Sequence, residues 1–349
     1  MYITDLKAIS PQATYNNGML NGVMKTIDDT VFLAEEPNYL EFIPKGLLRR
    51  MGKAVRMGIG TGLPLIKKHQ DIEGIIIGTA NGGLEDCVNF LNQIVEYEEG
   101  VLTPTNFVQS TPNAVAGLLA LMSENRSYNT TYTNGGLSFE STILDALLLF
   151  EENKQKKLLI GGLDEISQYN YNLDFLGGKY KVDKTNNTKL LDSKTIGTIC
   201  GEGATMFIVE KNTSDYIAKI VDVAQATYPT KKDLEELLIQ FLKKNNLILS
   251  DIDSIMTGLN GDTRHNDSYN YISEDLLPDA ALYSFKNLSG DYRTSSAFAT
   301  WLSAHILNKT MTDLSSITLR KGKIEKQQKN ILIYNHFDAI RHSFILLSK

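Results

Sequence analysis

The residues that could carry nucleophilic or metal chemistry are few and widely spaced. Two cysteines, Cys87 and Cys200, lie far apart in the 349-residue sequence, with no CxxC pair or Cys/His ligand cluster. This spacing argues against a structural zinc site, and we expect no metal. Cys87 follows Glu85 and Asp86, whose charges raise rather than lower a thiol pKa, so we expect it to be inert. Cys200 ends an apolar run and is expected to be a packing residue.

The serine, glycine and histidine signals are no stronger. Ser138 and Ser141 lie in no GxSxG elbow and have no identifiable histidine partner, so Ser138 is better interpreted as a helix N-cap. The glycines at 58–62 and 201–203 precede no GxxxxGK[ST] phosphate loop, and we expect no cofactor. His305 lies on an apolar helical pattern and is expected to be a core or interface residue.

Along the sequence, apolar residues follow two periodicities in alternation. Short apolar runs predict strands buried on both faces of a sheet, and apolar spacing near 3.6 residues predicts helices between them. The strand runs are 75–77, 158–160, 206–209, 217–223, 255–257 and 331–334, and the helical patterns are 84–97, 112–123, 138–152, 231–244 and 296–307. This alternation predicts an α/β fold with right-handed crossovers.

The chain divides near its middle. A polar stretch from Asn170 to Thr195 is interpreted as a long surface excursion. A break near Lys211–Asp215 separates two strand runs, which predicts units of residues 1–213 and 214–349. No short repeat is present, and spacing alone cannot reveal a diverged duplication of two α/β halves.

Composition excludes several classes of function. With 35 basic and 41 acidic residues the net charge is −6, which argues against nucleic-acid binding. The start of the chain lacks the features of a signal peptide, and no apolar run is long enough to cross a bilayer. We therefore expect a cytoplasmic protein without a membrane partner.

Four segments, in order along the chain, resemble the β-ketoacyl synthase family. They are the glycine-rich turn 78–86, the helix entry 107–117, the Gly-Glu-Gly-Ala segment 201–204 with its following strand, and the turn 335–337 before a last apolar strand. The resemblance implies a thiolase-like α-β-α-β-α sandwich of two similar halves, each with a five-stranded mixed sheet, and a dimer. The family transfers acyl groups from acyl carrier protein to a cysteine and condenses them with a decarboxylated malonyl unit.

The Cys-His-His set of that family is missing here. The turn 129–136 matches the nucleophile elbow and holds Tyr132 at the best position for the cysteine, with Thr131 or Thr133 after a one-residue shift. The first histidine position holds Leu259 or Asn260, with His265 several residues late.

The second histidine, expected after a Lys-x-x-x-Gly run, is replaced by Asp291, whose charge would repel a developing oxyanion. In the final turn, which begins with His336 and Phe337, Ala339 stands where the family has a gating phenylalanine.

A basic segment supplies a further hypothesis. Lys45, Arg49, Lys53 and Arg56 are spaced to share one helical face, with Arg50 beside them. The same region of the family often carries basic residues used to dock the acidic carrier protein. A solvated basic helix is the alternative.

Three functional hypotheses follow. The leading one is a non-condensing subunit that pairs with an active β-ketoacyl synthase in fatty-acid, polyketide or polyene-type biosynthesis, as chain-length-factor subunits do. The second is an atypical acyltransferase or 3-oxoacyl synthase using Thr133, Tyr132, Asp291 or His336. The third is a catalytically silent scaffold or carrier-binding homodimer, so the sequence leaves open whether the chain is an enzyme.

Overall fold

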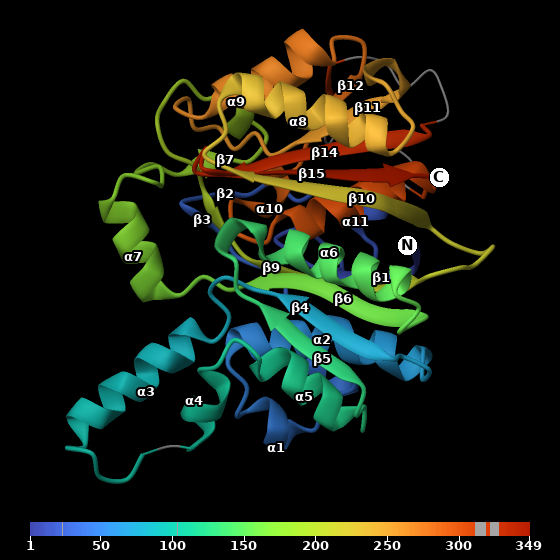
Figure 1. Cartoon of the computed structure of the whole chain (residues 1–349). Helices are drawn as coiled ribbons and strands as arrows, with labels where there is room; N and C mark the ends of the chain where they lie inside the picture. Colours follow the sequence, from blue (N-terminus) through green and yellow to red (C-terminus); the bar gives the residue numbers. More distant parts are fainter. Residues whose placement is uncertain (23, 103, 311–318, 322–327) are drawn as a thin grey trace.

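Two α/β halves stack on one another, each built on a mixed sheet (Figure 1). The computed structural model describes residues 1–22, 24–102, 104–310, 319–321 and 328–349. The main strands of the first half are β1 (Tyr2–Ile9), β4 (Gly74–Gly78), β5 (Tyr128–Tyr132), β6 (Lys157–Asp164) and β9 (Gly203–Glu210). Those of the second half are β10 (Ala218–Thr227), β11 (Ser254–Thr257), β12 (Ala281–Ser284), β14 (Asn330–Phe337) and β15 (Arg341–Ser348).

The two halves share one topology. The sheet of the first half has the order β5-β4-β6-β9-β1, and that of the second has β12-β11-β14-β15-β10 with the short β13 (Leu319–Lys321) outside β12. A short antiparallel pairing of β1 with β10, at Tyr2 and Ile3, joins the two. In the first half, β4 is parallel to β5 and β6, and β9 is antiparallel to β6 and β1. In the second half, β11 is parallel to β12 and β14, and β15 is antiparallel to β14 and β10. The halves are therefore structural repeats, which the sequence spacing could not reveal. The predicted boundary at residue 213 falls in the link between β9 and β10.

Helices form the other three layers, so the expected α-β-α-β-α sandwich is confirmed (Figure 1). The outer layer of the first half contains α1 (Lys45–Leu48), α2 (Lys53–Lys68) and α5 (Ala114–Met122), and that of the second half contains α8 (Lys231–Lys244) and α9 (Asn266–Asn270), which continues as a π-helical turn at Tyr271–Leu276. The middle layer contains α6 (Ser138–Glu151), α10 (Lys286–Ser289) and α11 (Ser296–Leu307). Every residue of α11 is buried, as a helix enclosed by two sheets requires.

Three further helices project from the layers. They are α3 (Leu84–Glu96), α4 (Pro104–Gln109) and α7 (Gln168–Leu176). Short pairings tie the connecting segments down: β2 (Asp28–Asp29) with β7 (Thr185–Asn186), and β3 (Val31–Phe32) with β8 (Cys200–Gly201). Single 3₁₀ turns occur at Met19–Asn21, Tyr39–Glu41, Gly135–Leu137, Leu190–Asp192 and Leu249–Asp251.

One local expectation was incomplete and one was wrong. The surface excursion 170–195 begins within the helix α7, and Tyr171 of that helix stacks on Tyr180 at 5.1 Å. Ser138 is the first residue of α6 rather than its N-cap, and its hydroxyl accepts from the Asn134 amide at 2.9 Å and donates to the Gly135 carbonyl. Within the described ranges, no helix combines the length and the apolar character needed to cross a membrane.

Candidate functional site

The elbow between β5 and α6 is closed by the final turn of the chain. Gly135 has φ +55°, a backbone conformation that favours glycine, and a Cβ atom on Gly136 would collide with the side chain of Phe337. The turn between β14 and β15 therefore lies directly against the elbow. A strand end of the first half and a hairpin of the second half form one site.

The elbow side chain that reaches the site is Thr133. Tyr132, the position first matched to the cysteine, packs against the apolar cluster between the sheets instead. Burial raises the pKa of its phenol to about 12, and the nearby Asp145 carboxylate adds to that rise. Thr133 lines a cavity of about 370 Å³ that Tyr132 does not line. Tyr132 therefore does not fill this cavity.

We call this space the elbow cavity. Its lining residues come from both halves: Thr133, Gly135, Gly136, Thr227, Tyr228, Arg293, Phe337, Asp338, Ile340 and Arg341. Arg341 donates to the backbone carbonyl of Asn134, and Lys179 lies 3.6 Å from the centre of the Phe337 ring. Lys179 also pairs with Asp338 at 3.1 Å. Arg293 and Arg341 thus place two guanidinium groups in the wall, and no sequence motif had grouped them.

No thiol lines the elbow cavity among the residues that the structure describes. Cys200 is buried where β8 runs beside Asp291, and burial raises the pKa of its thiol to about 12. Cys87 is half-buried on α3. The expectations that Cys200 is a packing residue and that neither cysteine occupies the elbow agree with these positions.

The two positions expected to hold catalytic histidines touch one another. Asn260, after β11, donates from Nδ2 to Oδ2 of Asp291 at 2.8 Å. Lys286 of α10 places Nζ 2.9 Å from Oδ1 of the same carboxylate. All three side chains are buried, with Lys286 1% and Asp291 4% exposed. Burial alone would raise the pKa of Asp291, but the Lys286 ammonium, with Lys179 behind it, holds that pKa below its usual value.

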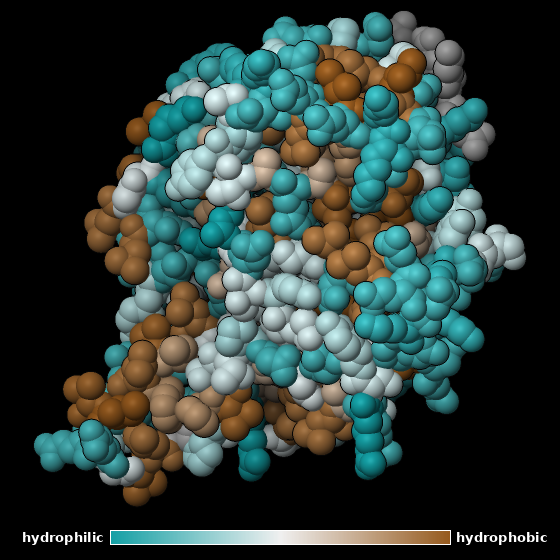
Figure 2. Space-filling view, viewed as in Figure 1, coloured by the Kyte–Doolittle hydropathy of each residue, from teal (hydrophilic) through white to brown (hydrophobic). Residues whose placement is uncertain are grey.

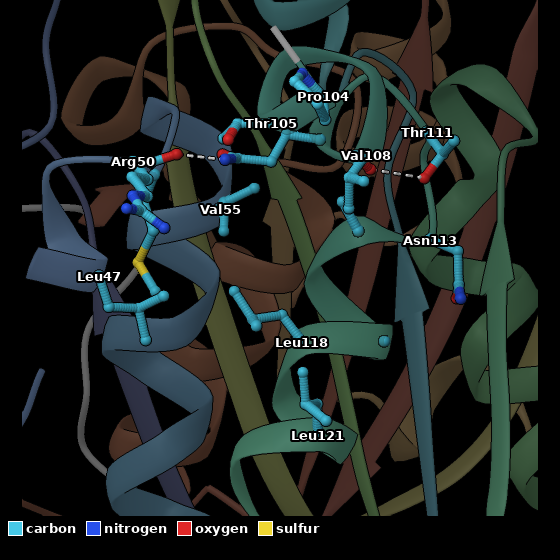
Figure 3. A pocket seen from close by; sticks show the side chains of 14 residues that line it. Leu47, Arg50, Val55, Pro104, Thr105, Val108, Thr111, Asn113, Leu118 and Leu121 are labelled. Carbon is cyan, nitrogen blue, oxygen red and sulfur yellow. Dashed lines mark hydrogen bonds between the residues drawn. The ribbon is translucent and has the colours of Figure 1, made fainter.

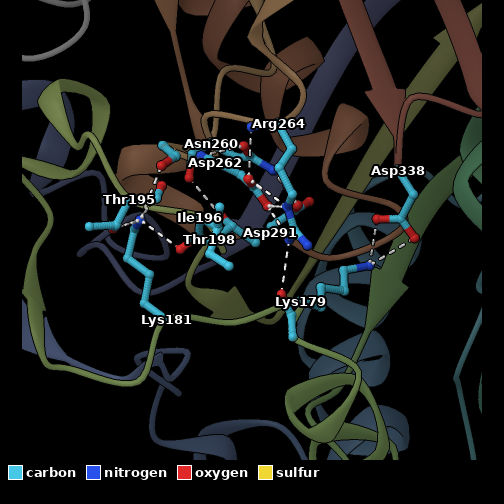
Figure 4. A network of polar contacts seen from close by, with 12 residues as sticks. Lys179, Lys181, Thr195, Ile196, Thr198, Asn260, Asp262, Arg264, Asp291 and Asp338 are labelled. Atoms are coloured by element: carbon cyan, nitrogen blue, oxygen red, sulfur yellow. Dashed lines mark hydrogen bonds and ion pairs between the residues drawn. The ribbon is translucent and has the colours of Figure 1, made fainter.

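Further polar contacts hold the loop that carries Asn260 (Figure 4). Thr198 donates to the Asn260 carbonyl at 2.8 Å. Lys181 donates to the Gly261 carbonyl at 3.1 Å and to the Thr195 hydroxyl at 2.9 Å. The excursion after α7 is thereby bonded to the loop that carries Asn260, so the loop is held in one conformation.

The remaining histidines are engaged elsewhere. His336, at the end of β14, is 2% exposed and does not line the elbow cavity. Its Nε2 lies 3.1 Å from the His265 carbonyl, and its Nδ1 accepts from the Ala339 amide at 3.3 Å. Burial lowers its pKa well below the usual value, so the ring is neutral. His265 lies beside it, with ring centres 6.0 Å apart, and neither ring replaces the missing pair.

The single basic helix face was a wrong prediction. The chain breaks between α1 and α2, because Gly52 is extended before α2 begins at Lys53. Lys53 pairs with the buried Glu202, and Arg56 pairs with Glu36 at 2.6 Å.

Lys45, Arg49 and Arg50 remain exposed. In the described part of the chain none of these three side chains forms an ion pair.

Comparisons with known proteins agree with the motifs. A family model described as "Beta-ketoacyl synthase, N-terminal domain" matches residues 28–173. No curated protein matches the sequence.

Solved structures match the whole chain. A structure described as the ishigamide ketosynthase/chain length factor has 15% identity and a TM-score of 0.81, covering 100% of this chain and 98% of the other. A ketosynthase (ApeO) in complex with its chain length factor (ApeC) from Xenorhabdus doucetiae has 14% identity and a TM-score of 0.77, covering 99% and 97%.

A third match is a type II polyketide synthase acyl-carrier protein in complex with its ketosynthase bound to the hexaketide. It has 13% identity and a TM-score of 0.73, covering 99% of this chain and 98% of the other. At these identities the structural matches establish the fold, and together with the family model they confirm the resemblance deduced from the motifs.

Proposed function

We propose that this divergent β-ketoacyl-synthase-like chain is a non-condensing subunit, acting with an active synthase and an acyl carrier protein in fatty-acid, polyketide or polyene-type biosynthesis. The observation that carries the proposal is the buried contact of Asn260 with Asp291 and Lys286. We infer from the loop motifs that Asn260 and Asp291 stand where the family has its two oxyanion donors, and here the two side chains are bonded to each other.

The chemistry of condensation is disfavoured at each step. Acyl transfer needs an activated nucleophile. Among the described residues that line the elbow cavity with Thr133 there is no histidine, and the carboxylate among them, Asp338, pairs with Lys179. Stabilising an oxyanion needs donors directed at it. Asp291 is an ionised acceptor, and its negative charge would raise the energy of that intermediate.

An uncovered surface on the first half supports a partner subunit. β5 is the last strand of its sheet among the described residues, so one of its edges is left unpaired. The 13-residue helix α3, which packs against α4, has no buried residue. Its apolar side chains Leu91 and Val95 are exposed. A helix of this length gains little stability without a packed face.

Other helices and links of the first half also expose apolar side chains, and Figure 2 shows the hydrophobic areas at the projecting helices separated by less hydrophobic surface. The exposed apolar side chains of these segments include Leu91, Val95, Val101, Phe107, Val108, Leu121, Leu144, Leu148, Leu173 and Leu176. We call these ten residues the apolar face. Patches of this extent mark protein interfaces, and an active synthase of the same fold is the partner that we propose for it.

Carrier docking remains part of the proposal in a reduced form. Lys45, Arg49 and Arg50 keep free cationic heads, whereas Lys53 and Arg56 are taken up by carboxylates of this chain. Docking of an acidic carrier therefore rests on the first three residues.

Co-expression with a β-ketoacyl synthase that retains the catalytic cysteine tests the proposal. We expect the two chains to co-purify as a heterodimer and the synthase alone to be acylated by a carrier thioester, as intact-mass spectrometry would record. A stable acyl adduct on this chain, removed by Thr133→Val, would contradict the non-condensing role and favour the acyltransferase alternative. A homodimer that ignores the synthase would favour the scaffold.

A further inference from the structure

A second cavity opens on the outer face of the first half, away from the elbow. It lies between α1, the start of α2, α4 and α5, has a volume of about 490 Å³, and shares no lining residue with the elbow cavity (Figure 3). We call it the outer pocket. Its volume is within the range of pockets that bind small molecules.

The wall of the outer pocket is aliphatic. Its lining residues are Leu47, Arg50, Met51, Val55, Pro104, Thr105, Val108, Gln109, Thr111, Asn113, Ala114, Gly117, Leu118 and Leu121. No aromatic ring is among them, so the pocket has no platform on which a planar ligand would stack. An aliphatic ligand suits such a wall better than an aromatic one.

Three of the polar side chains in the wall already have partners. Gln109 accepts from the Gly52 amide at 2.6 Å and donates to the Arg50 carbonyl, the bond drawn in Figure 3. Thr111 donates to the Val108 carbonyl, and Asn113 accepts from Thr131. These groups hold the walls together and are not available to bind a polar ligand, so the interior would receive hydrocarbon.

The rim of the outer pocket is cationic. Arg50 lines the pocket and is exposed, and Lys45 and Arg49 are exposed on the same short segment. Within the described residues no carboxylate pairs with any of the three. A ligand with an anionic head would meet an uncompensated guanidinium there.

We propose that the outer pocket binds one anionic amphiphile, with its unbranched hydrocarbon chain between α1, α4 and α5 and its head beside Arg50. The shape, the aliphatic wall and the unpaired cation each point to this class of ligand. The outer pocket shares Val108 and Leu121 with the apolar face and Arg50 with the proposed carrier-docking residues, so its ligand is tested on the isolated chain, without synthase or carrier protein. The assignment of the ligand can fail while the partnership holds, and the reverse.

Gly117 offers a clean way to fill the pocket. It lines the wall from the middle of α5, and a Cβ atom there would meet only the Asn113 amide nitrogen, at 3.5 Å. Gly117→Leu therefore puts a side chain into the pocket and improves the helix. Gly46→Leu is the matched control: it adds the same side chain on α1, where a Cβ atom meets nothing within 4 Å, and Gly46 does not line the pocket.

Isothermal titration of the purified full chain with octanoate, decanoate and dodecanoate, below their critical micelle concentrations, tests the proposal. We expect one site per chain and a dissociation constant that falls about fourfold per added methylene, equivalent to about 0.8 kcal/mol each, until the pocket is full. Gly117→Leu should abolish binding and Gly46→Leu should preserve it. Circular dichroism and a thermal melt would verify that both variants fold.

The head group is tested separately. Arg50→Ala should weaken decanoate binding about two- to fivefold and should not weaken binding of decyltrimethylammonium, because the guanidinium attracts the anionic head and repels the cationic one. Tighter binding of the cationic detergent than of decanoate to the unmodified chain would overturn the assignment of the head. Unchanged decanoate binding to Gly117→Leu would overturn the assignment of the pocket.

Discussion

At the scale of single residues, one buried ion pair determines the charge and the contacts of Asp291. Lys286 and Asp291 are almost completely enclosed, and each is the other's counter-ion. A buried pair adds little net stability compared with apolar residues, but removal of one partner leaves a buried charge without compensation. The Asp291 carboxylate therefore has a structural role as the counter-ion of Lys286.

We predict that Asp291→Ala lowers the free energy of unfolding by about 3–5 kcal/mol, because Lys286 is left buried and unpaired. Urea denaturation followed by the fluorescence of Trp301, the one tryptophan of the chain, would measure the loss. Asp338→Ala is the control. Its ion pair with Lys179 is partly exposed, and we expect a loss of at most about 1 kcal/mol. Equal losses in the two variants would refute the argument.

The sequence predicted the identity of these positions but not their contacts. The loop motifs located Asn260 and Asp291, and only the fold shows that they bond to each other. In the same way, the basic spacing located Lys53, while its partner Glu202 lies on a distant segment. Which charges meet depends on tertiary structure, so spacing along one helix could not reveal it.

The elbow residue illustrates a different limit. Successive side chains of a strand point to opposite faces, so a one-residue uncertainty in alignment decides whether a side chain enters the cavity or the core. Thr133 and Tyr132 differ in this way. The sequence left open which residue of 131–133 stands at the nucleophile position, and in the structure Thr133 lines the elbow cavity whereas Tyr132 does not.

At the scale of elements, the packing of α2 on α5 depends on glycine. A Cβ atom on Gly62 of α2 would lie 2.8 Å from Leu119 of α5, closer than the two helices allow. We predict that Gly62→Ala destabilises the chain by about 1–3 kcal/mol, whereas Gly117→Ala, which has room, stabilises it by up to about 1 kcal/mol. Chemical denaturation of the two single variants would test this opposition. A gain in stability for Gly62→Ala would contradict the close contact.

The buried helix α11 makes stability depend on pH. Burial lowers the pKa of His305 to about 4, so the folded state keeps the ring neutral while the unfolded chain protonates it near 6.5. This contribution is therefore present above about pH 6.5 and is lost as the pH falls towards 4. We predict that the free energy of unfolding falls by about 2 kcal/mol less in His305→Gln than in the unmodified chain when the pH is lowered from 7 to 5. Urea denaturation at the two pH values would measure the difference. Identical pH profiles would show that the ring is protonated in the folded state.

The sequence predicted regular elements well where burial repeats with a clear period. The observed bounds of α8 and α11 are those of the predicted patterns 231–244 and 296–307. The helix α7 was missed because its residues are polar and Asn-rich, with no buried position, and its stacking on Tyr180 is a tertiary contact. The repetition of the two halves was predicted by the family resemblance and not by spacing, since two halves can share a topology without sharing side chains.

At the scale of the whole molecule, both cavities depend on how large units meet. The elbow cavity needs both halves, because Thr133 comes from the first and Phe337 and Arg341 from the second. The apolar face lies on the first half, and its side chains are exposed in the described part of the chain. The elbow is completed within the chain, and we propose that another subunit covers the apolar face.

The apolar face gives the last prediction. Val95 is 80% exposed on α3, and an aspartate there would lie in water in the isolated chain but in an apolar interface in a complex. Val95→Asp should therefore leave the thermal midpoint of the isolated chain within a few degrees of its original value, and should reduce co-purification with the synthase at least tenfold. Ile248→Asp is the control, because Ile248 is 66% exposed on the second half, outside the apolar face. If both variants bind the synthase equally well, the partner does not cover α3, and the unburied apolar residues of that helix need another explanation.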